Sequence, residues 1–433
     1  MRKLTFLMAA ALVVGVVGCT STTMTDPKTY DPLAERYVRN VLAMGEHDAD
    51  YVDAYYGPPQ WRDEVKAQKR TLEQIRTDAA ALRAELAAMP KPSDRLLALR
   101  HEYLQRQTDA LLARIEILSG RKMTFDEESQ ALYNAVAPHH DEAYFQNLVG
   151  ALDRELPPGS GSITDRLEAF RKDFVIPKEK LDAVFQKAIE GCRARTLQHI
   201  ELPPGESFKV EYVTNKSWSG YNWYQGNFQS LIQVNTDLPI YIDRAIDLAC
   251  HEGYPGHHVY NVLLEKNMVK DRGWTEFTVY PLFSPQSLIA EGSANYGIDI
   301  AFPGKERVEY EKASLFPLAG LDASRAEQYY RIQDLTAKLS YAGNEAARRY
   351  LDGQITADQA AQWLTRYALM SPPRAAQRVK FIDQYRSYVI NYNLGKDLVR
   401  RHTEARAGND PAKRWEEFEL LLSSPTLPAG LDK

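Results

Sequence analysis

The chain has 433 residues, of which 44% are hydrophobic and 26% charged, and its formal net charge is −5. The charges are spread without long blocks or a basic stripe, so nothing indicates nucleic-acid binding. A chain of this length can bury a large core, either as one domain or as two that pack closely together. We expect a single large domain over residues 29–433.

Residues 1–18 have the pattern of a secretory signal peptide. Arg2 and Lys3 give a positive start, and residues 4–17 are almost all apolar. This apolar run is too short for an ordinary membrane span. The sequence therefore predicts an exported protein whose first 18 residues are removed.

A cysteine follows the apolar run, and the segment Val16-Val17-Gly18-Cys19 resembles the bacterial lipobox. In that motif the cysteine is lipidated and becomes the first residue of the mature protein. The alternative is an ordinary cleaved signal peptide with an incidental cysteine. We expect Cys19 to carry the lipid, residues 19–28 to form a tether, and the lipid to be the only membrane contact. Thr20 after the cysteine favours the outer membrane, facing the periplasm, by resemblance to the sorting rules of enteric-type bacteria.

Residues 29–200 have mostly helical spacing. The expected helices share apolar residues at intervals of three and four and end near proline or glycine. Ser93 can cap one of them, and Thr124 with Glu127 forms a capping-box pattern that opens another. The expected segments are 62–89, 94–118, one that opens at residue 124, 163–174 and 177–200.

The composition changes at Pro203-Pro204-Gly205. Residues 208–213 alternate and residues 231–234 are apolar and β-prone, with an aromatic-rich segment at 218–228 between them. This pattern predicts a small sheet or long hairpin within residues 205–240. The aromatic segment either offers an edge strand to an extended peptide or packs as a flap on the helices. Helical patterns resume at 240–300 and 305–425, so the expected fold is mainly α with a small β element.

The segment His251-Glu252-Gly253-Tyr254-Pro255-Gly256-His257-His258 places three imidazoles and one carboxylate in eight residues. It resembles the His-Glu-x-x-His zinc motif, in which the two histidines lie one helical turn apart. In a regular helix His257 would point about 120° away from His251, and His258 would lie about 10.5 Å along the axis. A regular helix therefore cannot bring either of them to the metal held by His251.

The same segment contains residues that interrupt a helix. Pro255 lacks a backbone N–H, and Gly253 and Gly256 adopt conformations that other residues resist. A bulge that loops out two residues would place His257 where the second ligand normally sits, so we favour His257 over His258. Glu252 then takes the position of the general base that activates water.

Other residues near the motif are candidates for supporting roles. Glu291, at a predicted helix start, is the expected third metal ligand; the alternative is a solvated or capping glutamate. Asp247 lies one turn before His251 and either holds the free nitrogen of its ring or is an exposed helix acid. Cys250 is a weaker ligand candidate because adjacent residues point in different directions. Cys192 and Cys250 either form a disulfide or are two buried thiols.

These segments resemble the bacterial domain-of-unknown-function family 885. That family carries His-Glu-x-x-Pro-Gly-His-His and a downstream Glu-Gly-Trp-Ala-x-Tyr; here the second segment begins at Glu291, with Ser293 in place of the tryptophan. The segment Tyr392-Asn-Leu-Gly395 resembles its Tyr-x-x-Gly helix, and residues 418–427 resemble its closing segment. The likeness covers most of the mature chain, most specifically residues 235–300. It implies a zincin-like, mostly helical fold and metallopeptidase activity.

A peptidase also needs a donor for the oxyanion of its tetrahedral intermediate. The resemblance favours Tyr392 for this role, and the other candidates are Tyr388, Tyr296 and His258. Arg378 or Arg386 could bind a substrate carboxylate in bidentate fashion, and a structural ion pair is the alternative for either.

The sequence thus predicts an envelope-anchored zinc metallopeptidase that acts on a peptide substrate. One Zn²⁺ is held by His251, His257 and Glu291, and Glu252 activates the water. One alternative is a zinc amidase or esterase with a non-peptide substrate. Another is a non-catalytic binding lipoprotein whose structural metal site is closed by His258 or Cys250. The zinc prediction requires that the helix break between Glu252 and His257 and that Glu291 face the gap.

Overall fold

A computed structural model describes residues 26–431, which form a mainly helical fold with two small sheets, as predicted. The signal peptide and Cys19 lie outside the described residues. The last residues of the expected tether already belong to the fold, because Pro27–Tyr30 form a 3-10 turn in which the N–H of Lys28 donates to the side chain of Asp26. Over residues 26–431, no helix combines the length and apolar character that a membrane crossing requires.

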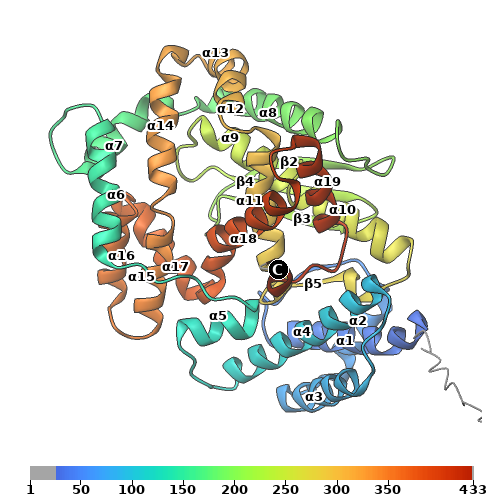
Figure 1. The fold of residues 1–433 in the computed structure, drawn as a ribbon. Coiled ribbons are helices and arrows are strands. Elements are labelled where there is room, and N and C mark those ends of the chain that lie inside the picture. The colour runs from blue at the N-terminus through green and yellow to red at the C-terminus, as the bar shows by residue number, and fades with distance from the viewer. Residues whose placement is uncertain (1–25, 432–433) are drawn as a thin grey trace, which may run out of the picture.

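The N-terminal helices gather at one end of the molecule (Figure 1). The expected helix at 62–89 is wrong, because Lys69 adopts a left-handed conformation and Thr71 caps a new helix in a capping box with Gln74. Asp94, rather than Ser93, caps the following long helix, whereas the capping box of Thr124 is confirmed. The helices at this end are α1 (Asp31–Gly45), α2 (Pro59–Gln68), α3 (Leu72–Ala88), α4 (Arg95–Leu118) and α5 (Phe125–Tyr133).

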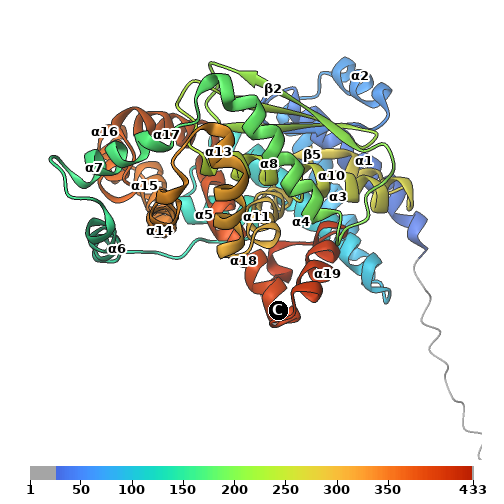
Figure 2. The ribbon, with the colours of Figure 1, turned by 90° about the horizontal axis from the view of Figure 1, so that it is seen from above.

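A second group of helices forms the opposite end (Figures 1 and 2). It comprises α6 (Glu142–Glu155), α7 (Ile163–Arg171), α14 (Ala326–Ala337), α15 (Tyr341–Leu351), α16 (Ala357–Tyr367) and α17 (Pro372–Tyr385). Between the two ends lie α11 (Pro285–Ala301) and α18 (Ile390–Ala407), which pack directly against each other. The remaining long helices are α8 (Leu181–Thr196), α10 (His257–Leu264) and α19 (Pro411–Leu422).

The predicted β element is a three-stranded sheet with the order β2-β4-β3. Strands β3 (Gly220–Gly226) and β4 (Gln229–Asn235) form an antiparallel hairpin, and β2 (Ser207–Val213) runs parallel to β4. The aromatic-rich segment thus supplies β3, which lies at an edge of this sheet.

A second sheet was not predicted. Strand β1 (Val52–Tyr55) pairs antiparallel with β5 (Val279–Pro281). The two strands have only four and three residues and are separated by more than half of the chain, so neither carries a local pattern that reveals the other. This pairing joins the N-terminal helices to the segment that precedes α11.

Two glycines set the distance between the central helices. A Cβ added to Gly292 of α11 would lie 2.4 Å from the carbonyl carbon of Gly395 of α18, closer than any real contact. The helices therefore pack backbone against backbone, which only glycine permits. Helix α11 of this pair contacts the segment that carries the histidine motif. A disulfide between Cys192 and Cys250 links that segment to α8.

Candidate metal centre

The helix that carries the motif is interrupted where the spacing requires it. Helix α9 (Asp243–Leu248) continues into a π-helical turn, η4 (Ala249–Gly253), and then ends. A new helix, α10, begins at His257. The predicted break between Glu252 and His257 is confirmed. Single π-helical turns add a residue to a helix and are common at functional sites.

Gly256 brings the two helix ends together. Its N–H donates to the carbonyl oxygen of Cys250 over 2.9 Å. A Cβ on Gly256 would lie 1.9 Å from the carbonyl oxygen of His251, so the chain could not fold back this tightly with any other residue. Pro255 packs toward α11, near Gly297. The turn through residues 254–256 therefore returns His257 to the side of His251.

His251, His257 and Glu291 converge on one point. The Nε2 atoms of the two histidines are 3.1 Å apart. Glu291 Oε2 lies 3.2 Å from His251 Nε2 and 3.7 Å from His257 Nε2. In the described part of the chain, these residues form the one group of three or more potential donors close enough to share an ion.

These distances fit a single zinc ion. Two ligands that bind zinc tetrahedrally at about 2.1 Å lie about 3.4 Å from each other, and the three separations range from 3.1 to 3.7 Å. Glu291 Oε2 is also buried without a hydrogen-bond partner within residues 26–431. Burial opposes ionisation of Glu291, but the two neighbouring imidazoles outweigh it and lower its pKa. The donor set is thus a carboxylate and two imidazoles, which zinc prefers.

The other oxygen of Glu291 is held by a tyrosine. The hydroxyl of Tyr388 donates to Glu291 Oε1 over 2.7 Å. The ring of Tyr388 contacts that of Tyr392, with centroids 5.8 Å apart, and both tyrosines line the cavity around the cluster. Burial raises the pKa of Tyr392, so its hydroxyl stays protonated and able to donate.

Glu252 lies beside the cluster, against strand β3. A Cβ on Gly220 would lie 2.7 Å from Glu252 Oε1, so this glycine makes room for the carboxylate. Asn222 donates to the backbone oxygen of Glu252 over 2.7 Å. Burial raises the pKa of Glu252, although His251 and His257 oppose the shift. A carboxylate with a raised pKa is suited to exchanging protons with water.

Several predicted supporting residues do not reach the cluster. His258 is fully buried, with Nδ1 bonded to Ser230 over 2.8 Å and Nε2 to Glu206 over 3.0 Å. Tyr296 does not line the cavity; its ring packs against Phe418. The oxyanion role considered for His258 and Tyr296 is therefore wrong, since both side chains are committed to the core.

Asp247 and Cys250 also have other partners. Asp247 lines the cavity, but its carboxylate binds Arg244 over 3.1 Å and Arg307 over 2.8 Å. No hydrogen bond between Asp247 and His251 occurs among the described residues, so the predicted support of the His251 ring is corrected. Cys250 is in the disulfide and cannot bind metal.

Two acidic residues near the motif escaped sequence reasoning. Asp53 of β1 lines the cavity and accepts a hydrogen bond from the hydroxyl of Tyr221; burial raises its pKa to about 7, against the effect of His257. Glu206 orients His258. Both come from segments without any metal-site pattern, and only the strand pairings bring them close.

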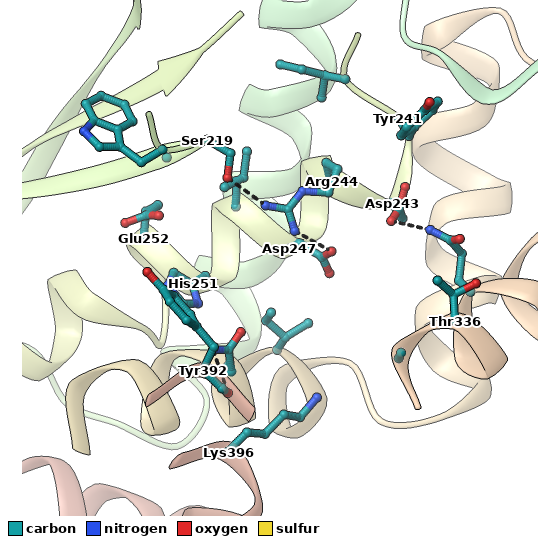
Figure 3. Close-up of a pocket in the computed structure, with 18 of the residues that line it drawn as sticks. Ser219, Tyr241, Asp243, Arg244, Asp247, His251, Glu252, Thr336, Tyr392 and Lys396 are labelled. Carbon is teal, nitrogen blue, oxygen red and sulfur yellow. Dashed lines mark hydrogen bonds and ion pairs between the residues drawn. The ribbon is translucent and has the colours of Figure 1, made fainter. Parts of the chain in front are cut away.

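The cluster opens into one large cavity of about 1480 Å³. His251, Glu252 and Tyr392 line this cavity (Figure 3). Arg244 lies further along, where it bonds to Ser219 and Asp247. Ser293 is fully buried and does not line this cavity.

Comparisons with known proteins support the fold alone. No protein-family model matches the chain, so the resemblance to family 885 stays a prediction, and no curated protein matches it. A solved structure of a candidate lipoprotein from Colwellia psychrerythraea is similar, with a TM-score of 0.52 and 15% identity. The match covers 86% of this chain but only 65% of the other protein. A candidate lipoprotein of unknown function from Shewanella oneidensis has a TM-score of 0.46 and 12% identity, with 94% of this chain and 82% of the other covered.

Proposed function

We propose that this protein is a zinc-dependent metallopeptidase. The observation that carries the proposal is the convergence of His251 Nε2, His257 Nε2 and Glu291 Oε2 within 4.8 Å. Neither His258 nor Cys250 is available as a fourth ligand, because one is hydrogen-bonded elsewhere and the other is oxidised. Three protein ligands with an open position are typical of catalytic zinc sites, whereas structural sites have four. A closed structural site is therefore the weaker alternative.

The residues around the cluster suit hydrolysis of an amide. Zinc would supply a Lewis acid that polarises a carbonyl oxygen and makes water acidic near neutral pH. Glu252 would accept a proton from the attacking water and pass it to the leaving amine. Tyr392, whose hydroxyl stays protonated, would donate a hydrogen bond to the developing oxyanion.

The surroundings favour a peptide over a small amide or ester. The cavity, at about 1480 Å³, exceeds the roughly 300–1,000 Å³ of ordinary small-molecule sites. Residues 220–222 of the edge strand β3 line it beside Glu252. An edge strand can pair with an extended peptide, which would lay a scissile bond alongside the cluster.

The test separates metal binding from hydrolysis. Full-length protein is purified, its metal content is measured by mass spectrometry, and it is assayed on short peptides, small amides and esters. The Glu252→Gln variant should keep one zinc per chain and lose peptide hydrolysis by at least about a hundredfold. His251→Ala should lose the metal, and the control His139→Ala, at an exposed histidine of another surface pocket, should change neither. An active Glu252→Gln variant would refute the mechanism, and selective cleavage of esters or small amides would favour the alternative substrate class.

We further propose that the enzyme is anchored in the cell envelope through a lipid on Cys19. The lipobox-like segment supports this, as does the name of the similar structure from Colwellia psychrerythraea. Cys19→Ala should move the protein from the membrane fraction to the soluble fraction of cells without changing its activity per molecule. Unchanged fractionation would contradict the anchor.

A further inference from the structure

One cation in the cavity lies close to the candidate metal centre. Arg378 of α17 lines the cavity, and its guanidinium carbon is 5.8 Å from the ring centre of Tyr392. Tyr392 in turn contacts Tyr388, which holds Glu291. Arg378 is therefore separated from a proposed metal ligand by only two aromatic side chains.

This cation has no acidic partner. Within residues 26–431 no hydrogen bond or ion pair engages the Arg378 guanidinium, and its Nε is buried without a partner. Burial lowers the pKa of Arg378, although Tyr392 and Glu291 oppose the shift. Arg378 is partly exposed to the cavity, so its charge is solvated in part, but leaving it without a counter-ion still has a cost in free energy. A ligand with negative charge would remove that cost.

Several other cations that line the same cavity are paired with carboxylates. Arg244 and Arg307 bind Asp247 over 3.1 and 2.8 Å, and Lys396 binds Asp299 over 2.8 Å. Arg378 therefore differs from these three cations of the same cavity, each of which has a carboxylate partner.

The two neighbouring arginines of this region also have partners. Arg386, the other arginine considered for substrate binding, pairs with Glu128 over 2.7 Å and is therefore structural. Arg374, one turn before Arg378 on α17, donates to the carbonyl oxygen of Pro239 over 3.2 Å. Arg374 lines the same cavity and so provides a matched control.

We propose that Arg378 binds a carboxylate of the substrate, so that the protein selects peptides with a free carboxylate close to the cleaved bond. The inference rests on the proposed peptidase function and names its substrate class. A planar guanidinium binds carboxylates through two parallel hydrogen bonds. The Arg378 guanidinium lies near the aromatic rings of Phe381 and Tyr392, which position it in the cavity. The carboxylate of a peptide C-terminus and that of an aspartate or glutamate side chain share this chemistry.

The test compares four versions of one peptide. They are a free C-terminal acid, its C-terminal amide, and two amides that carry glutamate or glutamine next to the C-terminus. Zinc-loaded full-length protein is compared with Arg378→Gln, Arg378→Lys and the control Arg374→Gln. We expect Arg378→Gln to lose about 10- to 100-fold in kcat/KM on carboxylate-bearing peptides, mainly through KM, and less than about threefold on the others. Arg378→Lys should recover part of the preference, and Arg374→Gln should keep all of it.

The pattern of preference identifies the source of the carboxylate. A preference for the free acid over its amide points to a peptide C-terminus, and a preference for glutamate over glutamine points to an acidic side chain. Either result supports the proposal. Equal kcat/KM of the wild type on all four peptides, or an equal loss on all four in Arg378→Gln, would overturn it.

A binding measurement separates this inference from the peptidase proposal. Calorimetry measures the binding of N-acetyl-phenylalanine and of its amide to metal-free full-length protein. Without zinc, the metal cannot contribute to binding of the acid. The acid should bind at least about tenfold more tightly than the amide, and Arg378→Gln should abolish the difference. If this difference is found but no peptide is cleaved, the carboxylate site stands and the peptidase proposal fails. If peptides are cleaved but acid and amide bind alike, the carboxylate site fails alone.

Discussion

Gly256 is the residue that allows His251 and His257 to meet. Its Cα passes so close to the carbonyl oxygen of His251 that a Cβ would lie 1.9 Å away. The choice between the two adjacent histidines follows from their surroundings, because Ser230 and Glu206 occupy both nitrogens of His258. The two extra residues between these histidines, compared with the ordinary zinc motif, are therefore accommodated by a folded-back turn that still brings the two side chains together.

The two tyrosines beside Glu291 should have separable effects. Tyr388→Phe removes the hydrogen bond to Glu291 Oε1 and should weaken zinc binding about 10- to 100-fold, as the loss of such supporting bonds does elsewhere. Tyr392→Phe should leave zinc affinity unchanged and lower kcat by about 100-fold, because it removes the oxyanion donor. Competition with a chromogenic chelator and steady-state kinetics measure the two quantities. Equal loss of zinc affinity in both variants would contradict this assignment.

The contact between α11 and α18 places the tyrosines beside the proposed metal ligands. Glu291 and Gly292 are adjacent on α11, and Tyr392 and Gly395 lie within one turn of each other on α18. The close approach of the two glycines therefore also sets how near Tyr392 and Tyr388 come to Glu291. Gly395 of the Tyr392-Asn-Leu-Gly395 segment is therefore required for the packing of these two helices.

Gly395→Ala tests this requirement. The added Cβ would lie 2.7 Å from the carbonyl oxygen of Leu288 and 3.0 Å from the Cα of Gly292, so the helices must separate. We expect a loss of about 1–3 kcal/mol in the free energy of unfolding together with weaker zinc binding. Gly343→Ala is the matched control, because a Cβ on this helical glycine meets nothing within 4 Å and alanine favours a helix by about 1 kcal/mol. Denaturant unfolding of both variants measures the difference, and equal stability would argue against the packing requirement.

The candidate site is assembled from the whole molecule. Asp53 lies on β1, next to the N-terminal helices. The two histidines and Glu291 come from the middle of the chain, and Arg378 comes from α17, at the opposite end of the molecule. Each of these side chains lies on an element that packs against others, so the cavity depends on the complete fold. Metal binding should in turn stabilise that fold, because a bound zinc ion would bridge the segment around His251 to α11.

Metal removal should therefore lower the thermal stability of the protein. An ion present at a hundred times its dissociation constant stabilises the folded state by about 2.7 kcal/mol, which corresponds to a melting temperature a few degrees higher. Differential scanning calorimetry before and after chelation measures the shift. His251→Ala should show no response to the chelator, and a similar shift in that variant would mean that the stabilising ion binds elsewhere.

Much of the fold and part of the site could be predicted from local patterns. The mainly helical class, the capping box at Thr124, the β element before the motif and the helix break are all confirmed. The separation of α2 from α3 was missed, because Thr71 and Gln74 cap a helix inside a continuous helical pattern. The β1–β5 pairing was missed because strands this short and this distant leave no periodic signal.

The sequence by itself determined which side chains are available for a metal and that the helix carrying them must break. Those conclusions follow from residue chemistry and helix geometry, which are local. Only the tertiary structure decided that His258 and Asp247 bind other residues, that Tyr296 packs outside the cavity, and that Arg378 has no carboxylate partner within residues 26–431. The physical reason is that the interactions of a buried polar group depend on the atoms that surround it, and those atoms come from segments that are distant in the chain.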